Sequence, residues 1–168
     1  MIYDSEEVDG FEIGLKSNLL DNNMRLNATY YKYEYTDLQV QLFDAAIIQF
    51  STFNAGAVET EGFEADLLWY TDIPGLSLRG QFAWTDATNT GDFITPGGEN
   101  LKGSKRSYSP EIAGSFGLSY DSGLSNGWRY NISTDARYSD EYGWGTYIDS
   151  PMQDSFWIND VALSLYSE

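Results

Sequence analysis

Apolar and polar residues alternate along several stretches of this chain, and this alternation constrains the fold more than any other feature of the sequence. The pattern is clearest in residues 10–16, 62–69, 76–85 and 128–138. A period of two residues is typical of strands whose two faces meet different surroundings. Several stretches run for about 9–12 residues, against about five or six in most soluble sheets, and this length suits a strand that crosses a bilayer. The sequence therefore predicts an all-β protein with long strands.

The links between the predicted strands alternate in length. Short links rich in Asn, Asp, Pro, Ser and Gly occupy 19–23, 71–75 and 121–127, and long links occupy 36–56, 86–108 and 140–154. Short turns at one end of a sheet and long loops at the other are typical of an up-and-down outer-membrane barrel. The chain has room for about six strands and the beginning of a seventh. We therefore predict an antiparallel, up-and-down transmembrane β-barrel wall, and the resemblance described below implies that it is a fragment of a larger barrel.

The second predicted strand departs from simple alternation. Its apolar residues share one face up to Tyr30, after which Tyr31, Tyr33 and Tyr35 share the other. A bulge near Tyr30 would explain the switch, because an extra residue exchanges the two faces of a strand. A strand that rises out of the membrane, where both faces are wet, would explain it equally well.

Composition excludes several classes of site. The chain has no His and no Cys, so a Ser-His-Asp triad, a Cys nucleophile, a His or Cys zinc site, a haem His ligand and an iron–sulfur cluster all lack their side chains. The net charge of −17, from 26 acids and nine bases, argues against a nucleic-acid partner, whose phosphates require an excess of Lys and Arg. No cofactor or metal is predicted.

A short repeat supports a regular hairpin architecture. The tripeptide Gly-Phe-Glu occurs at 10–12 and again at 62–64, which is 52 residues later, and Phe116 follows Phe63 at a similar interval. One hairpin and one long loop per period is the simplest explanation.

An ordered series of strand phrases resembles a known family. The phrases are GFEIGLK (10–16), RLNATYY (25–31), YTDLQV (35–40), NAG (54–56), EGFEADL (61–67), GLSL (75–78) and SPE (109–111). Their order and spacing resemble the late barrel strands of the TonB-dependent outer-membrane receptors of Gram-negative bacteria. The resemblance extends over nearly the whole chain.

This resemblance implies a function and several partners. Family members have barrels of about 22 strands, closed by an N-terminal plug. Residues 1–168 are then expected to be part of one such barrel domain, without the plug, the TonB box or the remaining strands. The whole receptor would sit in the outer membrane, bind a scarce ligand such as a ferric siderophore and import it with energy passed on by TonB. Outer-membrane lipid, the plug domain, TonB and the small-molecule ligand are the implied partners, and no enzymatic reaction is implied.

In such a barrel one face of each strand meets lipid and the other faces the lumen. The predicted lipid-facing residues are Phe11, Ile13, Leu15, Phe63, Leu67, Trp69, Phe82, Trp84, Phe116, Leu118 and Trp128. The predicted lumen-facing residues are Glu64, Asp66, Arg79, Arg129, Asp135 and Arg137, together with Glu12, Lys16 and Arg25. Charges of both signs on one face predict cross-strand ion pairs. The resemblance adds the plug as a further partner of this face.

Two long links carry the candidate ligand contacts. The link 140–154 has four acids, no base and three aromatic residues, Tyr142, Trp144 and Tyr147. Aromatic rings among polar groups suit an organic chelate or a sugar. The link 86–108 instead carries Lys102, Lys105 and Arg106, which would attract an anionic iron complex.

Two other classes of protein fit parts of the pattern. A soluble carbohydrate-binding module would also use aromatic residues and strands, but it would seal its apolar face against a second sheet. A glycoside hydrolase would use two carboxylates, and Glu64 and Asp66 lie two positions apart on one face. The surroundings of the apolar face therefore discriminate between a membrane wall and a soluble module.

Overall fold

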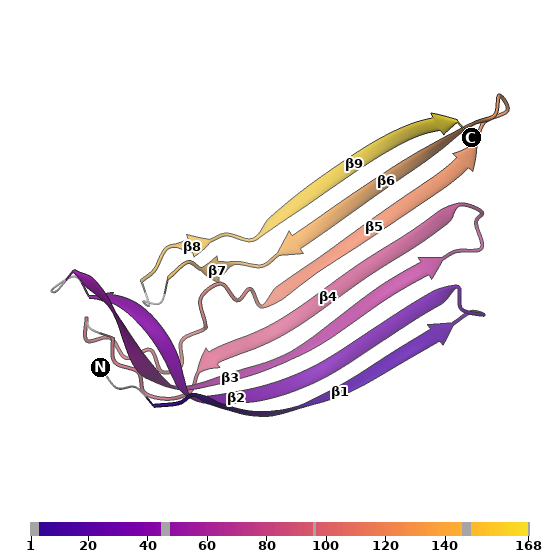
Figure 1. Ribbon diagram of the computed structural model, residues 1–168. Coiled ribbons are helices and arrows are strands. Elements are labelled where there is room, and N and C mark those ends of the chain that lie inside the picture. The colour runs from indigo at the N-terminus through magenta and orange to yellow at the C-terminus, as the bar shows by residue number, and fades with distance from the viewer. Residues whose placement is uncertain (1–3, 45–47, 96, 146–148, 168) are drawn as a thin grey trace.

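One antiparallel sheet of seven strands dominates the molecule (Figure 1). The computed structural model describes residues 4–44, 48–95, 97–145 and 149–167. The sheet contains β1 (Glu7–Leu19), β2 (Met24–Asp44), β3 (Gln49–Tyr70), β4 (Leu76–Asn89), β5 (Ile112–Gly123), β6 (Trp128–Ser139) and β9 (Phe156–Ser167). Each strand pairs with the next one along the chain, and β7 (Tyr142–Gly143) and β8 (Met152–Gln153) form a small hairpin between β6 and β9. The predicted all-β, antiparallel, up-and-down architecture is confirmed.

The strand register places the apolar residues on one face of the sheet. Residues opposite one another in an antiparallel ladder point to the same side. Ile13 lies opposite Tyr30, and the same row continues across the sheet through Phe63, Trp84 and Ile112. The residues predicted to meet lipid all lie on this side, which we call the apolar face.

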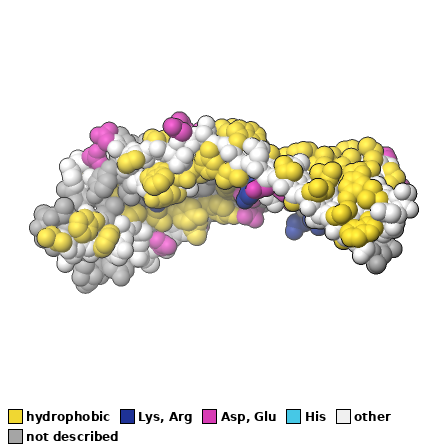
Figure 2. All heavy atoms as spheres, turned by 90° about the horizontal axis from the view of Figure 1, so that it is seen from above, with side chains coloured by type: hydrophobic (Ala, Val, Ile, Leu, Met, Phe, Trp, Pro, Cys, Tyr) yellow, Lys and Arg dark blue, Asp and Glu magenta, His cyan; other side chains and the backbone are white. Residues whose placement is uncertain are grey.

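Nothing among the described residues covers the apolar face. Ile13 is 69% exposed, Phe116 51% and Leu163 72%. Figure 2 shows hydrophobic side chains gathered along the convex side of the bent sheet, with Lys and Arg on its hollow side. A soluble module with a sealed core would have buried these residues. Within the described ranges, no helix is long and apolar enough to cross a membrane.

Short turns connect the strands at one end of the sheet, as predicted, and the β4–β5 and β6–β9 links at the other end are long (Figure 1). The β1–β2 turn passes through Leu20, Asp21 and Asn22, which all have positive φ. Asp and Asn tolerate this left-handed conformation better than most residues. The β5–β6 turn is shorter than predicted, because β5 continues to Gly123 and only residues 124–127 remain outside the strands.

The predicted long link 36–56 is wrong as a loop. β2 and β3 continue through it and pair as far as Asp44 and Gln49, forming a ribbon that extends beyond the other strands. The ladder is interrupted only between Asp37 and Gly56, which lie opposite each other and both have positive φ, 53° and 29°. We call this interruption the crease. The ribbon includes the apolar residues Leu38, Val40, Phe43 and Phe50, and its backbone pairs as a hairpin rather than forming a loop.

The predicted bulge near Tyr30 is also wrong. Pairing between β1 and β2 is continuous from Met24 to Thr36, so the tyrosines keep regular alternation on the face opposite the apolar one. A Cβ atom at Gly10 would overlap the Tyr33 ring, and one at Gly62 would overlap the Tyr31 side chain. Each glycine of the Gly-Phe-Glu repeat therefore makes room for a tyrosine from β2, which covers the exposed backbone of that glycine.

Candidate functional site

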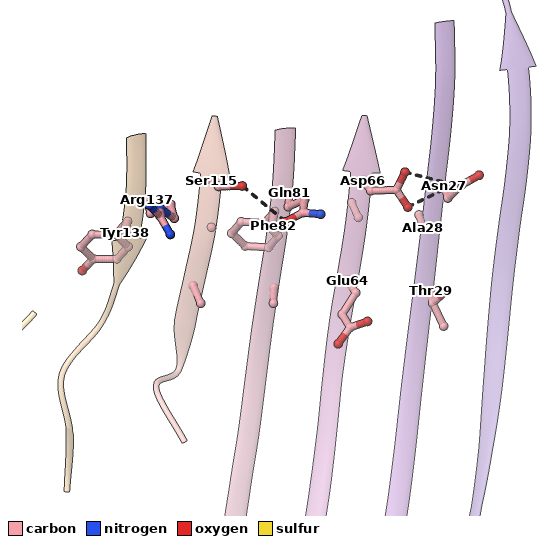
Figure 3. Close-up of a pocket in the computed structure, with 14 residues that line it drawn as sticks. Asn27, Ala28, Thr29, Glu64, Asp66, Gln81, Phe82, Ser115, Arg137 and Tyr138 are labelled. Carbon is pink, nitrogen blue, oxygen red and sulfur yellow. Dashed lines mark hydrogen bonds between the residues drawn. The ribbon is translucent and has the colours of Figure 1, made fainter. Parts of the chain in front are cut away.

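The face opposite the apolar one carries charged and polar side chains, and we call it the polar face. The register places all the predicted lumen-facing residues on it, namely Glu64, Asp66, Arg79, Arg129, Asp135 and Arg137 with Glu12, Lys16 and Arg25. Two troughs of about 540 and 930 Å³ lie among strands β2 to β6 here (Figure 3). The structure thus gathers these residues on one surface, and their role in a lumen remains a prediction.

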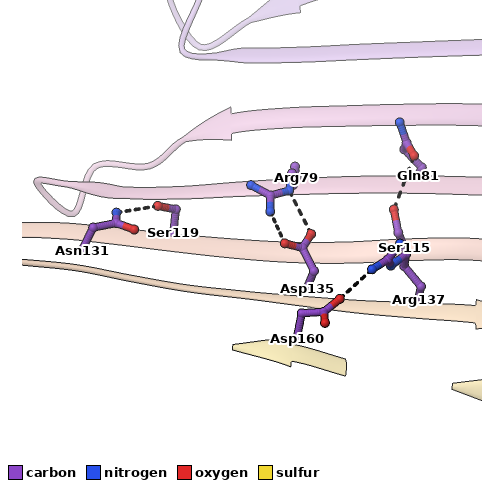
Figure 4. Close-up of polar contacts among 8 residues, drawn as sticks. All are labelled: Arg79, Gln81, Ser115, Ser119, Asn131, Asp135, Arg137 and Asp160. Atoms are coloured by element: carbon purple, nitrogen blue, oxygen red, sulfur yellow. Dashed lines mark hydrogen bonds and ion pairs between the residues drawn. The ribbon is translucent and has the colours of Figure 1, made fainter. Parts of the chain in front are cut away.

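Glycine makes the central ion pair of the polar face possible. Arg79 on β4 and Asp135 on β6 lie in the same row with Gly117 of β5 between them. Arg79 Nε donates to Asp135 Oδ1 at 3.1 Å, and a second bond from Nη2 reaches Oδ2 (Figure 4). A Cβ at Gly117 would lie 2.5 Å from Nε and 2.8 Å from Oδ1. The guanidinium therefore crosses a strand that any larger residue would block.

Two further arginines on the polar face form ion pairs. Arg137 lies 2.6 Å from Asp160, and Arg129 pairs with Asp121. These pairs confirm the cross-strand ion pairs expected from charges of both signs. Asp66 instead accepts two hydrogen bonds of 3.0 Å from the amide of Asn27 (Figure 3).

The buried apolar side chains of the described chain gather at the loop end of the sheet. Phe93 and Leu101, which are 6% and 1% exposed, form a small core in the β4–β5 link, and Val40 of the ribbon packs against them. Gly91 comes so close to the ribbon backbone that a Cβ would overlap the Ala57 nitrogen. We call the ribbon beyond the crease and the β4–β5 link together the cap.

The three cations predicted to attract an anion have different surroundings. Lys102 lies 3.4 Å from Asp92, and Lys105 lies 2.9 Å from Asp86 and 3.7 Å from Glu111. The hydrogen bond to Asp86 raises the pKa of Lys105. Arg106 forms no ion pair with a described carboxylate; its Nη1 donates to the amide oxygen of Asn89 at 3.3 Å. Burial lowers the pKa of Arg106 from its usual value.

The aromatic residues of the β6–β9 link are only partly brought together. Tyr142 packs against Tyr108 with ring centres 6.2 Å apart, and the amide of Tyr108 donates to the carbonyl of Gly143, which ties the two long links together. Trp144 is 52% exposed. Tyr147 lies outside the described residues.

Two adjoining cavities lie where these links meet the sheet. The first, of about 390 Å³, is lined by Lys105, Arg106 and Tyr142 together with serine and acidic residues. The second, of about 320 Å³, is lined by Tyr35, Leu38, Val58, Thr60, Thr85, Ala87, Arg106 and Ser109. Lys102 and Trp144 line neither. The sequence did not predict the second cavity, although the tyrosine run that it singled out includes Tyr35, which lines this cavity.

No group of three or more acidic, His or Cys side chains in the described ranges is arranged to hold a metal ion.

Comparison with known proteins defines the class. The family model described as "TonB dependent receptor-like, beta-barrel" matches residues 3–166. The chain belongs to this family, a family of receptors and transporters, and the resemblance noted in the sequence is confirmed. No curated protein sequence matches the chain.

Solved receptor structures share the fold. The siderophore receptor PiuA from Acinetobacter baumannii superimposes with a TM-score of 0.72 at 22% identity over 96% of this chain and 22% of its own. The ferric yersiniabactin uptake receptor FyuA from Yersinia pestis gives 0.76 at 14%, over 96% and 22%. The ferric preacinetobactin receptor BauA from Acinetobacter baumannii gives 0.70 at 15%, over 96% and 23%. The chain thus spans between a fifth and a quarter of the length of these receptors.

Proposed function

We propose that this chain is the wall and part of the outer loops of a receptor that imports a ferric siderophore across the outer membrane of a Gram-negative bacterium. The observation that carries the proposal is the two-sided sheet. Its apolar face has no cover among the described residues, while its polar face carries charged side chains and the ion pairs of Arg79, Arg129 and Arg137. Such a sheet suits lipid on one side and an aqueous, plug-filled lumen on the other.

The limit of the apolar face supports the proposed orientation in the membrane. Toward the long links, the row that begins at Phe11 continues across this face through the charged residues Lys32, Glu61 and Asp86. Lys32 lies 3.4 Å from Glu61 and 2.9 Å from Glu59, so water-exposed ion pairs begin there. Charged side chains are costly beside hydrocarbon, and this row therefore suits the upper edge of the bilayer. The cap then lies outside the cell, where a ligand arrives.

The names of the similar receptors support a ferric siderophore as the ligand. The plug and TonB would complete the transporter in the full-length protein. The proposed ligand contacts are Lys105, Arg106, Tyr142, Trp144 and Tyr147 of the two long links. Lys102 is left out, because it pairs with Asp92 and lines neither cavity. No observation favours a carbohydrate-binding module or a hydrolase.

Uptake of ⁵⁵Fe tests this function in cells. Strains with and without the full-length receptor, and a strain without TonB, would be given ferric tricatecholates, trihydroxamates and mixed-ligand chelates. We expect the receptor deletion and the TonB deletion to abolish uptake of the same chelate. If the receptor deletion leaves the uptake of every ferric chelate unchanged, the proposed function is wrong.

A further inference from the structure

Arg106 and the adjacent cation Lys105 lie on opposite sides of the sheet. Lys105 joins Asp86 and Glu111, and Glu111 in turn accepts a hydrogen bond from Trp84 at 3.4 Å. Trp84 and Asp86 belong to the apolar side of β4. Arg106 instead lines a cavity with Thr85 and Ala87, which belong to the polar side of the same strand. Of these two adjacent cations, only Arg106 therefore turns to the hollow side of the sheet.

The positive charge of the Arg106 guanidinium is not paired with a described carboxylate. Its side chain is half-buried, and its guanidinium has the neutral amide of Asn89 as a partner but no ion pair with a described carboxylate. A guanidinium presents several N–H donors in a planar fork that matches a carboxylate or a similar pair of anionic oxygens. An anion placed here would regain the interactions that burial has removed.

The two cavities beside Arg106 differ in chemistry. Both are lined by Thr85, Arg106 and Ser109, so they meet at the guanidinium. The larger one continues among hydroxyl and charged groups of the two long links. The smaller one is an open depression lined on one side by Tyr35, Leu38 and Val58, of which Val58 is only 3% exposed. A ligand that fills both cavities needs a charged part and an apolar part.

We propose that Arg106 anchors an organic anion, which receives hydrogen bonds from the guanidinium and places an apolar or aryl group against Tyr35, Leu38 and Val58. The inference rests on the proposed function for the origin of the ligand, and it narrows the ligand to anionic aryl chelates. It also separates Arg106 from Lys102 and Lys105, whose charges are already neutralised by Asp92, Asp86 and Glu111.

The test measures binding to the purified full-length receptor in detergent by quenching of its tryptophan fluorescence. The probes are a ferric complex of 2,3-dihydroxybenzoate, the metal-free aryl carboxylate salicylate, and an uncharged ferric trihydroxamate. The variants are Arg106→Ala, Arg106→Lys and Ala87→Leu, with Lys102→Ala as the matched control because Lys102 carries the same charge in the same link. Far-UV circular dichroism and heat-modifiable gel mobility would report whether each variant folds.

We expect the anionic aryl probes to bind, and Arg106→Ala to weaken that binding by about 10- to 100-fold, as for loss of charge-assisted hydrogen bonds. Arg106→Lys should restore only part of the affinity, because an ammonium cannot present the planar fork. Ala87→Leu, which fills the apolar cavity, should weaken aryl binding, and Lys102→Ala should change it less than about twofold.

The alternative outcomes separate the two proposals. Equal effects of Arg106→Ala and Lys102→Ala on the aryl anions, or tight binding of the uncharged trihydroxamate alone, would overturn the Arg106 site and leave the siderophore function standing. Binding of salicylate that depends on Arg106, without binding of any ferric chelate, would support the site and count against the siderophore function. Binding of none of the three probes would overturn the proposed ligand class.

Discussion

The wall and the cap of this molecule are stabilised in different ways. In the wall, strands β1 to β6 and β9 are joined by continuous backbone ladders, while large apolar side chains such as Phe116 and Leu163 remain exposed. In the cap, Phe93 and Leu101 are buried against Val40 in a small core. The cap therefore carries its own apolar interior, whereas the wall depends on what surrounds it. The wall and the cap therefore differ in whether their apolar side chains face outward or pack against one another.

Removal of the cap core should give the largest effect. We expect Leu101→Ala to destabilise the cap locally by about 2–5 kcal/mol, the usual cost of a Leu→Ala cavity. Hydrogen exchange in the full-length receptor should show faster exchange in the β4–β5 link and unchanged protection in β4 and β5. Ile94→Ala, at a 58% exposed position of the same link, is the matched control and should have little effect. Loss of protection throughout the wall would contradict an independent cap.

A charge on the apolar face should have a slightly smaller but global effect. Phe116 lies in the middle of β5, and Phe116→Arg should destabilise the receptor in a bilayer by about 2–4 kcal/mol. Ser115→Arg, one residue away on the polar face, should cost much less. Urea unfolding in lipid vesicles measures both variants. Equal costs for the two would mean that the faces do not meet different solvents.

The smallest effect concerns the ion pairs of the polar face. Asp135→Asn should cost less than about 1 kcal/mol, because the side chains of Arg79 and Asp135 are 51% and 34% exposed and water screens the pair. The loss should shrink further at high salt. The same unfolding assay at low and high salt checks this. A loss of unfolding free energy above about 2 kcal/mol would mean that water reaches this ion pair less than we infer.

Alternation in the sequence was sufficient to predict the wall. Apolar residues at every second position, such as Phe63, Leu67 and Trp69, assign faces directly, because a strand has no other way to present them together. The composition of the short turns, exemplified by Asp21 and Asn22, located the hairpins for the same local reason.

The cap could not be predicted from the same pattern. Phe93 and Leu101 lie in a link without periodicity, and their burial depends on the approach of Val40 from a strand more than 50 residues earlier. The extension of β2 and β3 was missed because the apolar positions of β2 change phase between Tyr35 and Leu38, where Asp37 has positive φ. For the candidate site, the sequence predicted Arg106 together with Lys102 and Lys105. It could not separate them, because the difference depends on which side of β4 each cation faces and on whether a carboxylate elsewhere in the chain pairs with it.

The crease at Asp37 and Gly56 has a consequence for side-chain direction. Simple alternation along β2 would put Leu38 and Val40 on the same side as Tyr30, which is the apolar face. Instead, Val40 packs on Phe93 and Leu101, and Leu38 shares a cavity with Tyr35. Two opposed left-handed residues thus rotate the continuing ribbon without adding a residue or shifting the register. A strand can in this way move a row of apolar side chains from one side of a sheet to the other while its ladder continues.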